Sequence, residues 1–213
     1  MNKIVTTIIT SGGNSTRFGS NKLLEKIDGT TVIEHTISKF LEFSSLIVIP
    51  AKEDIKKAIE NSKLYEKFGE KITFAHAGET RQKSVYNGLK AIKKTDIVLI
   101  HDGARPFIDK DTIKKTIDLT FEKGAVVVGQ MAVDTIKMVE DGKIIKTLDR
   151  KQIFQAQTPQ AFSFDLILKI HEKYKDSPNF TDDSSMAEAY GKSVYIIDNK
   201  NKNIKITTKK DLE

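Results

Sequence analysis

Residues 4–22 read IVTTIITSGGNSTRFGSNK, and this stretch decides how the rest of the chain is interpreted. The apolar run Ile4–Ile9 predicts a buried β-strand. The glycines within Ser11–Gly19 let the backbone turn sharply and approach a ligand, so that exposed N–H groups can hold phosphate oxygens. Arg17 and Lys22 add two positive charges beside these groups. The stretch therefore predicts a phosphate site after the first strand of an α/β fold.

The glycine-rich segment follows neither of the two common nucleotide-binding motifs. It lacks the Gly-Lys-Ser/Thr ending of a P-loop, and its glycines do not have the spacing of a dinucleotide-binding fingerprint. We therefore expect a nucleotide that is held in a less common way.

Composition indicates one globular α/β domain over residues 1–213, with 38% hydrophobic and 30% charged residues. The net charge of +6 could indicate nucleic acid. However, the basic residues are dispersed among acidic ones and form no continuous stripe, which favours a small phosphorylated substrate. With no cysteine, thiol catalysis and cysteine-bound metal are excluded. With no apolar stretch long enough to span a membrane and no signal peptide, we expect a cytoplasmic enzyme without membrane or nucleic-acid partners.

Short apolar runs alternate with helical patterns along the chain, which is typical of βαβ units. We expect a Rossmann-like, mostly parallel sheet flanked by helices. The predicted strands are Ile4–Ile9, Leu46–Ile49, Ile72–Ala75, Ile97–Ile100, Ala125–Gln130 and Val194–Ile197. The predicted helices are Thr31–Phe43, Lys52–Asn61, Thr80–Ile92, Asp111–Glu122 and Ser163–Lys173.

One segment interrupts this alternation. Residues 134–148, DTIKMVEDGKIIKTL, alternate polar and apolar side chains around Asp141–Gly142, which predicts a β-hairpin. We expect residues 134–150 to form an arm inserted in the domain, with no helix to cover it. A second copy of the chain is the partner that we expect for this arm.

The fourth predicted strand is followed by polar residues that could bind a ligand. Ligands of open α/β sheets bind beyond the carboxyl ends of the strands. Asp102 could therefore hold Mg²⁺, and Arg105 could bind a phosphate. In the alternative interpretation, Asp102 caps the next turn and pairs with Arg105. His101 is predicted to be a packing or capping residue.

The third predicted strand is followed by Gly78-Glu-Thr-Arg-Gln-Lys-Ser84, which opens a helix. Ser84 and the backbone near Gly78 could contact the edge of a base. Arg81 could organise the glycine-rich segment or lie in solvent. The alternative is a helix start that is merely capped by Thr80.

Later motifs add further candidates. Arg150 follows the arm and could reach a phosphate, and Thr158–Pro159 predicts a turn. Thr181–Asp183 predicts a capped helix start, with a second carboxylate cluster as the alternative. Lys205 lies in Ile204–Ile206, a short alternating strand, and its side chain could lie on the surface or point into the site.

The residue types that are missing point to the same chemistry. The chain has no histidine pair at metal-binding spacing and no Gly-x-Ser-x-Gly motif. Phosphoryl or nucleotidyl transfer to a nucleophile that is already an anion needs neither of these. It depends on positioning and on neutralisation of charge by Mg²⁺, lysine and arginine.

The order of these motifs resembles the 2-C-methyl-D-erythritol 4-phosphate cytidylyltransferase family over Ile4–Leu212. The matching segments are SGGNSTRFG with Lys22, GETRQKSVYNGL at 78–89, HDGARPFI at 101–108, VDTIK at 133–137, LDR at 148–150, QTPQAF at 157–162, TDD at 181–183 and NIKIT at 203–207. The resemblance implies transfer of a cytidylyl group from CTP to the sugar-alcohol phosphate, with release of pyrophosphate, in non-mevalonate isoprenoid synthesis. It also implies Mg²⁺ or another divalent cation.

The resemblance further implies roles for individual residues. Arg17, Lys22 and Lys205 would be catalytic, and Asp102 would hold the metal. The residues implied at the nucleotide are Ser11, Gly12, Gly13, Asn14, Ser15, Gly78, Glu79, Ser84 and Asp102. The residues implied at the second substrate are Asp102, Arg105, Thr135, Arg150 and Lys205, with Thr135 and Arg150 supplied by the neighbouring subunit of a homodimer.

The chain departs from the family pattern in its first loop. The family usually has Ala-Ala-Gly-x-Gly-x-Arg followed by Pro-Lys-Gln, whereas this chain has Ser11-Gly-Gly and then Asn21-Lys-Leu23. The spacing from Arg17 to Lys22 is also about two residues shorter. Two alternatives remain: ribitol-5-phosphate cytidylyltransferase, with the same nucleotide chemistry, and a nucleotide-binding regulatory protein without catalysis.

Overall fold

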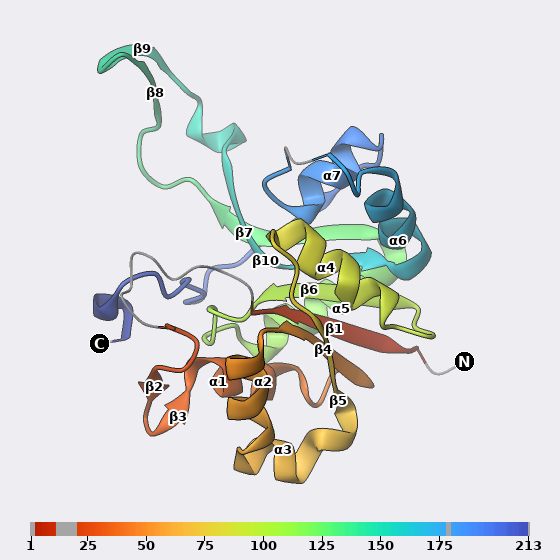
Figure 1. Cartoon of the computed structure of the whole chain (residues 1–213). Helices are drawn as coiled ribbons and strands as arrows, with labels where there is room; N and C mark the ends of the chain where they lie inside the picture. The colour runs from red at the N-terminus through yellow and green to blue at the C-terminus, as the bar shows by residue number, and fades with distance from the viewer. Residues whose placement is uncertain (1–2, 12–20, 178–179, 213) are drawn as a thin grey trace.

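Seven strands form a single sheet in the order β11-β7-β10-β6-β1-β4-β5 in the computed structural model of the chain (Figure 1). The structure describes residues 3–11, 21–177 and 180–212. Only β10 runs antiparallel to its neighbours in this sheet, so the expected mostly parallel α/β fold is confirmed. The strands are β1 (Val5–Thr10), β4 (Leu46–Ala51), β5 (Ile72–His76), β6 (Ile97–Asp102), β7 (Ala125–Met131), β10 (Phe154–Ser163) and β11 (Tyr195–Asp198).

Helices cover both faces of the sheet, which explains why β1 and β6 are buried along their whole length. Because successive side chains of a strand point to opposite faces, Ile9 of β1 packs in one core and Ile8 in the other. The first core is covered by α1 (Val32–Phe40), α2 (Glu53–Glu60) and α5 (Lys110–Lys123). The second is covered by α4 (Arg81–Lys90), α6 (Phe164–Lys173) and α7 (Asp183–Ala189).

The remaining elements are short. They are α3 (Lys63–Phe68), the strand pair β2 (Lys26–Ile27) and β3 (Thr30–Thr31), and three 3₁₀ turns at Gly69–Lys71, Arg150–Gln152 and Lys209–Leu212.

Helix starts follow from capping side chains that accept hydrogen bonds from otherwise unpaired N–H groups. Thr80 caps α4 and Asp109 caps α5, each through its side-chain oxygen. Asp182 caps α7 in a capping box with Ser185. The structure therefore confirms that Thr80 caps α4 and that the Thr181–Asp183 motif starts a capped helix.

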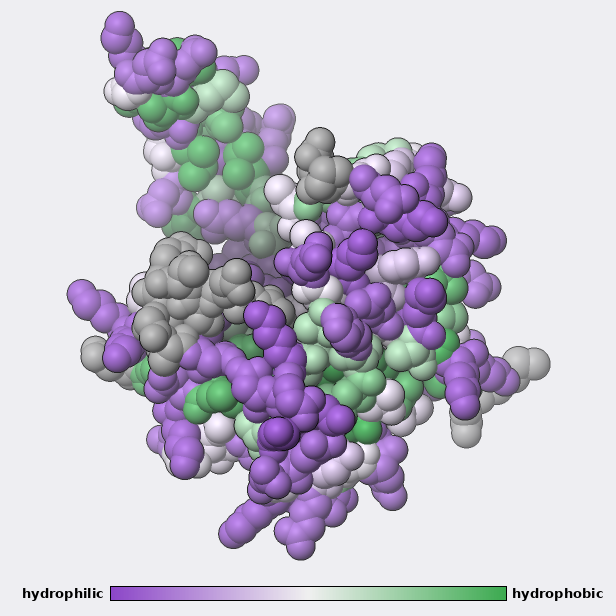
Figure 2. All heavy atoms as spheres, in the orientation of Figure 1, coloured by the Kyte–Doolittle hydropathy of each residue, from purple (hydrophilic) through white to green (hydrophobic). Residues whose placement is uncertain are grey.

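The predicted hairpin is confirmed as β8 (Lys137–Glu140) and β9 (Lys143–Thr147). Its tip has positive φ at both Asp141 and Gly142, which matches the right-handed twist of the two strands. The hairpin extends away from the sheet and its helices (Figure 1), and every residue of β8 and β9 is exposed. Apolar side chains lie along this arm (Figure 2), among them Met138, Val139, Ile144 and Ile145, and the exposed Val133 directly precedes it.

Two local expectations were wrong. Thr158–Pro159 does not form a turn between elements but lies inside β10, where the pairing with β7 is interrupted between Ala156 and Gln160. Ile204–Ile206 does not form a strand: the N–H of Ile206 donates to the carbonyl of Ala104, but no ladder of hydrogen bonds follows. In both places, the side-chain contacts described below replace regular backbone pairing.

Within the described ranges, no helix has the length and apolarity needed to cross a membrane.

Candidate active site

Ser11 and Asp102 lie at the same edge of the sheet. Thr10, the last residue of β1, is paired in register with Asp102, the last residue of β6. Between them, the N–H of Gly103 donates to the Thr10 carbonyl at 2.9 Å. A Cβ on Gly103 would lie 2.8 Å from that carbonyl oxygen and from Cδ1 of Ile33, so this close approach requires glycine. The sequence HDGAR thereby places Asp102 beside Ser11, where the glycine-rich segment begins.

Three cations surround the Asp102 carboxylate. Nζ of Lys205 lies 2.8 Å from Oδ2, Nε of Arg105 lies 3.4 Å from Oδ2, and Nε of Arg81 lies 3.5 Å from Oδ1. The Asp102 side chain is 10% exposed and that of Lys205 is 41% exposed. Lys205 is therefore the member of this cation cluster that a ligand reaches most easily. In the alternative interpretation of the sequence, Asp102 pairs with Arg105, and this ion pair is confirmed.

The cluster keeps Asp102 ionised. Burial by itself raises the pKa of this carboxyl, but the charges of Arg81, Lys205 and Arg105 outweigh burial and hold the pKa well below its usual range. Arg81 also pairs with a second carboxylate, that of Asp183, so the three cations and the two carboxylates together leave one excess positive charge at this edge of the sheet. Such an excess suits a polyanionic ligand such as a phosphate chain.

Arg81 joins this cluster to a second buried carboxylate. Its Nη1 lies 2.7 Å from Oδ2 of Asp183, and Oδ1 of Asp183 lies 3.0 Å from Nε2 of His171. Burial raises the pKa of Asp183, but Arg81 and His171 lower it to about 2. Burial lowers the pKa of Arg81, but Asp183 and Asp102 raise it above its ordinary value. Of the two alternatives for Arg81, the one that places it in solvent is therefore wrong, and Asp183, in a capped helix start, shares Arg81 with Asp102.

Sequence reasoning missed His171. Its side chain is fully buried on the face of α6 that also buries Ile167 and Ile170. A histidine on the apolar face of a predicted helix is the signal that could have identified it, since a buried polar group needs a partner. That partner, Asp183, lies on the next helix along the chain.

The predicted base-binding segment lies at the start of α4, next to Arg81. The N–H of Gly78 donates to Oγ of Ser84 at 3.0 Å. A Cβ on Gly78 would lie 2.5 Å from Cβ of Lys83, so no side chain fits there. Glu79 is exposed. The structure thus brings Gly78 and Ser84 together, and the role of all three residues at a base stays a prediction.

Lys22, a predicted catalytic residue, contacts the C-terminal segment that carries Lys205. Nζ of Lys22 donates to the carbonyl of Ile206 at 2.8 Å, and Ile206 directly follows Lys205 in the sequence. Ser11 donates its hydroxyl to the carbonyl of Pro50 at 2.6 Å, which fixes the start of the glycine-rich segment. Five further predicted residues lie outside the described residues: Gly12, Gly13, Asn14, Ser15 and Arg17.

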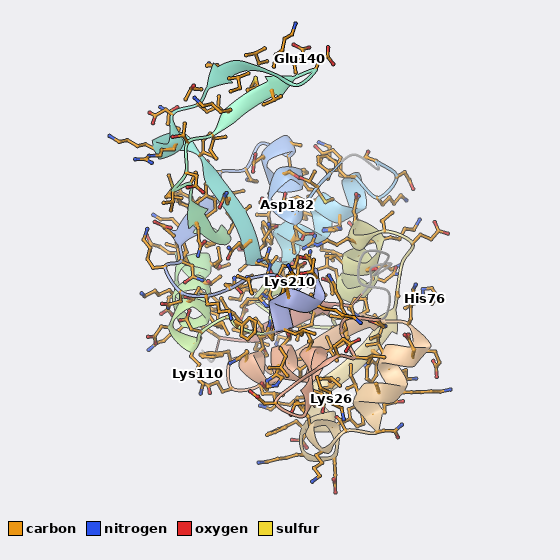
Figure 3. The ribbon with its side chains drawn as sticks, turned by 90° about the vertical axis from the view of Figure 1, so that its left-hand side faces the viewer. Lys26, His76, Lys110, Glu140, Asp182 and Lys210 are labelled. Atoms are coloured by element: carbon orange, nitrogen blue, oxygen red, sulfur yellow. The ribbon has the colours of Figure 1, made fainter. Side chains whose placement is uncertain are left out.

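Thr135 and Arg150 lie apart from this site within one chain. Both are exposed on the arm, and Arg150 donates to the carbonyl of Val133 at 2.6 Å. Figure 3 shows Glu140 at the far end of the arm, away from Asp182 and Lys210 in the body of the molecule. In the part of the chain that the structure describes, no hydrogen bond or ion pair joins Thr135 or Arg150 to the cation cluster.

The described residues do not build a metal site on their own. They contain no group of three or more acidic or histidine side chains that could hold a metal ion. Asp102 is the only carboxylate among the predicted metal ligands, and both of its oxygens contact cations. This donor set fits a magnesium ion only if phosphate oxygens supply most of its ligands, which is how Mg²⁺ commonly binds with nucleotides.

The mostly parallel sheet and the cation cluster at its carboxyl edge define the class of protein. It is an α/β protein with a cation cluster, suited to a phosphorylated ligand, where β1 and β6 end.

Comparisons with known proteins give the particular family. The sequence model of IspD, 2-C-methyl-D-erythritol 4-phosphate cytidylyltransferase, matches residues 5–213, and the chain therefore belongs to the IspD family. The chain is 42% identical over 213 residues to the enzyme of that name from Clostridioides difficile, which covers 96% of this chain and 89% of that one. It is 40% identical over 214 residues to the Clostridium novyi enzyme, with 96% and 92% covered.

Solved structures agree with these matches. The 4-diphosphocytidyl-2C-methyl-D-erythritol synthase of Anaerococcus prevotii superposes with a TM-score of 0.86 at 31% identity, covering 99% of this chain and 95% of that one. The 2-C-methyl-D-erythritol 4-phosphate cytidylyltransferase of Francisella tularensis superposes with a TM-score of 0.83 at 30% identity, covering 99% and 97%.

Proposed function

We propose that this chain transfers the cytidylyl group of CTP to 2-C-methyl-D-erythritol 4-phosphate in isoprenoid precursor synthesis. A phosphate oxygen of the second substrate attacks the α-phosphorus of CTP, and the bond from that phosphorus to the bridging oxygen breaks. Pyrophosphate leaves, and the product is 4-CDP-2-C-methyl-D-erythritol. The observation that carries the proposal is the cluster of Arg81, Arg105 and Lys205 around Asp102 beside the start of the glycine-rich segment. The names of the relatives favour this reaction over ribitol-5-phosphate cytidylyl transfer.

On the nucleotide side, we assign the triphosphate to the segment that begins at Ser11, with Gly12, Gly13, Asn14 and Ser15. Arg17 and Lys22 would neutralise the charge that develops on the α-phosphate, because fixed cations stabilise a transition state without reorganising. Gly78, Glu79 and Ser84 would contact the cytosine, in part through backbone groups. The position of Ser84 one helical turn inside α4 supports this assignment.

On the side of the second substrate, Asp102, Arg105 and Lys205 would bind and orient the phosphate that attacks. Lys205 would exchange its contact with Asp102 for a phosphate oxygen when substrates bind, since its ammonium group is the most exposed cation of the cluster. Asp102 would then face the sugar-alcohol hydroxyls or a metal ion. Arg105 is held more firmly, because its Nη1 also donates to the carbonyl of Asn203 at 2.8 Å.

Mg²⁺ or another divalent cation would enter with CTP and neutralise phosphate charge there. Asp102 is the protein carboxylate that would approach it. The donor set described above supports a metal ion that is carried by the nucleotide.

We further propose that residues 1–213 act as one nucleotidyltransferase domain, that the 134–150 arm joins two copies into a homodimer, and that the enzyme works in the cytoplasm. The exposed apolar side chains of the arm support the dimer, because apolar groups of this number favour burial against a partner. In such a dimer, Thr135 and Arg150 of one subunit would contact the second substrate in the site of the other. No nucleic-acid or membrane partner is proposed.

The proposed function is tested by pyrophosphate release from CTP with Mg²⁺ and each candidate acceptor. Methylerythritol 4-phosphate is expected to support turnover, and ribitol 5-phosphate is expected to support little. Turnover with ribitol 5-phosphate alone would assign the chain to the alternative reaction. If the chain binds CTP but releases no pyrophosphate with either acceptor, the result would favour a nucleotide-binding regulatory protein without catalysis.

A further inference from the structure

We propose that His101 is a positioning residue of the active site: as the neutral tautomer protonated at Nε2, it ties the backbone of Arg105 to the hydroxyl of Thr158 and so holds the turn that presents Asp102. This inference builds on the proposed function. The histidine is fully buried, so it cannot contact a substrate itself.

A continuous network of hydrogen bonds runs through His101 and joins the two ends of the Asp102–Arg105 turn. The N–H of Asp102 donates to Oγ1 of Thr158 at 3.0 Å. The same oxygen lies 3.1 Å from Nδ1 of His101, and Nε2 of His101 lies 3.0 Å from the carbonyl oxygen of Arg105. These hydrogen bonds therefore connect the N–H of Asp102, at one end of the Asp102–Arg105 turn, to the carbonyl of Arg105 at the other end.

The partners fix where the protons lie. A carbonyl oxygen only accepts, so Nε2 of His101 must carry a hydrogen and donate to Arg105. The oxygen of Thr158 already accepts from the N–H of Asp102, so its own hydrogen goes to Nδ1 of His101, the other partner of that oxygen among the described residues, and Nδ1 has no hydrogen. Nδ1 then accepts from the hydroxyl of Thr158, which in turn accepts from Asp102. Every donor in this chain thus has one acceptor, which is the arrangement that buried polar groups require.

The same network reaches the C-terminal segment that carries Lys205. The side-chain amide of Asn203 donates to the carbonyl of Thr158 at 2.9 Å, and the carbonyl of Asn203 accepts from Nη1 of Arg105 at 2.8 Å. His101, Thr158 and Asn203 therefore join the end of β6, the interruption in β10 and the C-terminal segment. These are the three backbone segments whose relative placement determines the distances among Asp102, Arg105 and Lys205.

Packing alone does not account for a histidine at this position. The ring packs against Phe40 with centroids 4.8 Å apart, a contact that a phenylalanine would make equally well. Only an imidazole accepts from Thr158 at one nitrogen and donates to Arg105 at the other. A displacement of about 1 Å in reacting groups lowers rates by about 100-fold. We therefore expect the loss of these two hydrogen bonds to affect kcat.

Three variants at position 101 separate the two contacts. His101→Phe keeps the ring shape and loses both, His101→Gln keeps a donor toward Arg105, and His101→Asn keeps an acceptor toward Thr158. We expect His101→Phe to lower kcat by about 10–100-fold with the KM for CTP changed less than about threefold, and His101→Gln to restore part of the loss. Thr158→Val removes the central hydroxyl without altering the histidine and should lower kcat in the same direction. Thr116→Val serves as the control, because Thr116 is a buried threonine on α5 whose hydroxyl bonds only within its helix.

The wild-type rate with CTP and methylerythritol 4-phosphate is the reference, so failure of the proposed function is seen before any variant is compared. Folded Phe and Thr158→Val variants with wild-type kcat would overturn the positioning role. If His101→Phe does not fold, the positioning role is still tested by kcat of Thr158→Val and by the protonation of the His101 ring nitrogens in the wild type. Long-range ¹H–¹⁵N spectra at pH 7 should show His101 protonated at Nε2 alone, and a proton on Nδ1 would overturn the inference whether or not the enzyme turns over.

Discussion

Nζ of Lys205 lies 2.8 Å from Oδ2 of Asp102, which links the C-terminal segment to the end of the sixth strand. The carboxylate is nearly buried, whereas the lysine remains accessible. The pair therefore holds a cation at the position where a phosphate would bind, and keeps it available for exchange.

Replacement of Lys205 by methionine tests this pair. Methionine keeps an apolar stem of similar length and removes the charge, so we expect kcat/KM for pyrophosphate release to fall by about 10²–10³-fold, the range seen for loss of one group that stabilises a transition state. Lys200→Met is the matched control, because Lys200 pairs with Asp198 on the surface outside the cluster. Equal rates for the two variants would exclude Lys205 from the site.

Replacement of Arg81 by methionine tests the link between the two buried carboxylates. Asp183 and Asp102 would both lose a cation while buried, and we expect the free energy of unfolding to fall by about 3–5 kcal/mol. Arg81→Lys keeps the charge but cannot contact both carboxylates with the same planar group, so it should recover only part of this loss. Urea unfolding measures both variants. A change within about 0.5 kcal/mol, typical of a surface substitution, would contradict the buried geometry.

Acid should destabilise the fold through His101. The folded pKa of about 4 lies below the ordinary value of 6.5, so the unfolded chain binds the proton more readily. The contribution of His101 to the free energy of unfolding is fully present above pH 6.5. It falls as the pH is lowered toward 4, by about 3 kcal/mol at most. Unfolding free energies measured from pH 7.5 to 4 should show a shallower dependence in His101→Gln than in the wild type. Parallel curves would contradict the depressed pKa.

The arm is tested by mixing two inactive variants. Arg150→Ala has an intact cation cluster, and Lys205→Met has an intact arm. If the arm of one subunit completes the site of the other, mixed dimers contain one complete site, and activity should return when the two proteins are mixed. Ile144→Asp should weaken the dimer in sedimentation experiments, because it places a charge within the exposed apolar surface of the arm. Activity that stays at the sum of the two variants would contradict a shared site.

The sheet and the hairpin could be predicted because their signals are local. Buried parallel strands appear as short runs of apolar and β-branched residues, and the arm appears as mixed apolar and polar residues around the turn Asp141–Gly142. β10 was missed because its sequence carries Thr158–Pro159, which indicates a turn when only neighbouring residues are considered. Its pairing with β6 and β7 comes from contacts far apart in the sequence.

The site was predictable to a similar extent. The motif order placed Asp102, Arg105 and Lys205 in one site, and the structure brings these three side chains together. Asp183 was not predicted as a partner of Arg81, nor His171 as a partner of Asp183, since contacts between residues far apart in the sequence leave no pattern in a single sequence. The hydrogen bonds of His101 and Thr158 also depend on where β6 and β10 meet.

The central claim is that CTP and methylerythritol 4-phosphate react at the Asp102 cluster. ³¹P NMR of a mixture of both substrates, Mg²⁺ and wild-type enzyme tests it most directly. We expect a diphosphate diester and pyrophosphate to form in equal amounts, only when both substrates are present, and to form far more slowly with Lys205→Met. Pyrophosphate released without the sugar phosphate, or the same rate in Lys205→Met, would contradict it.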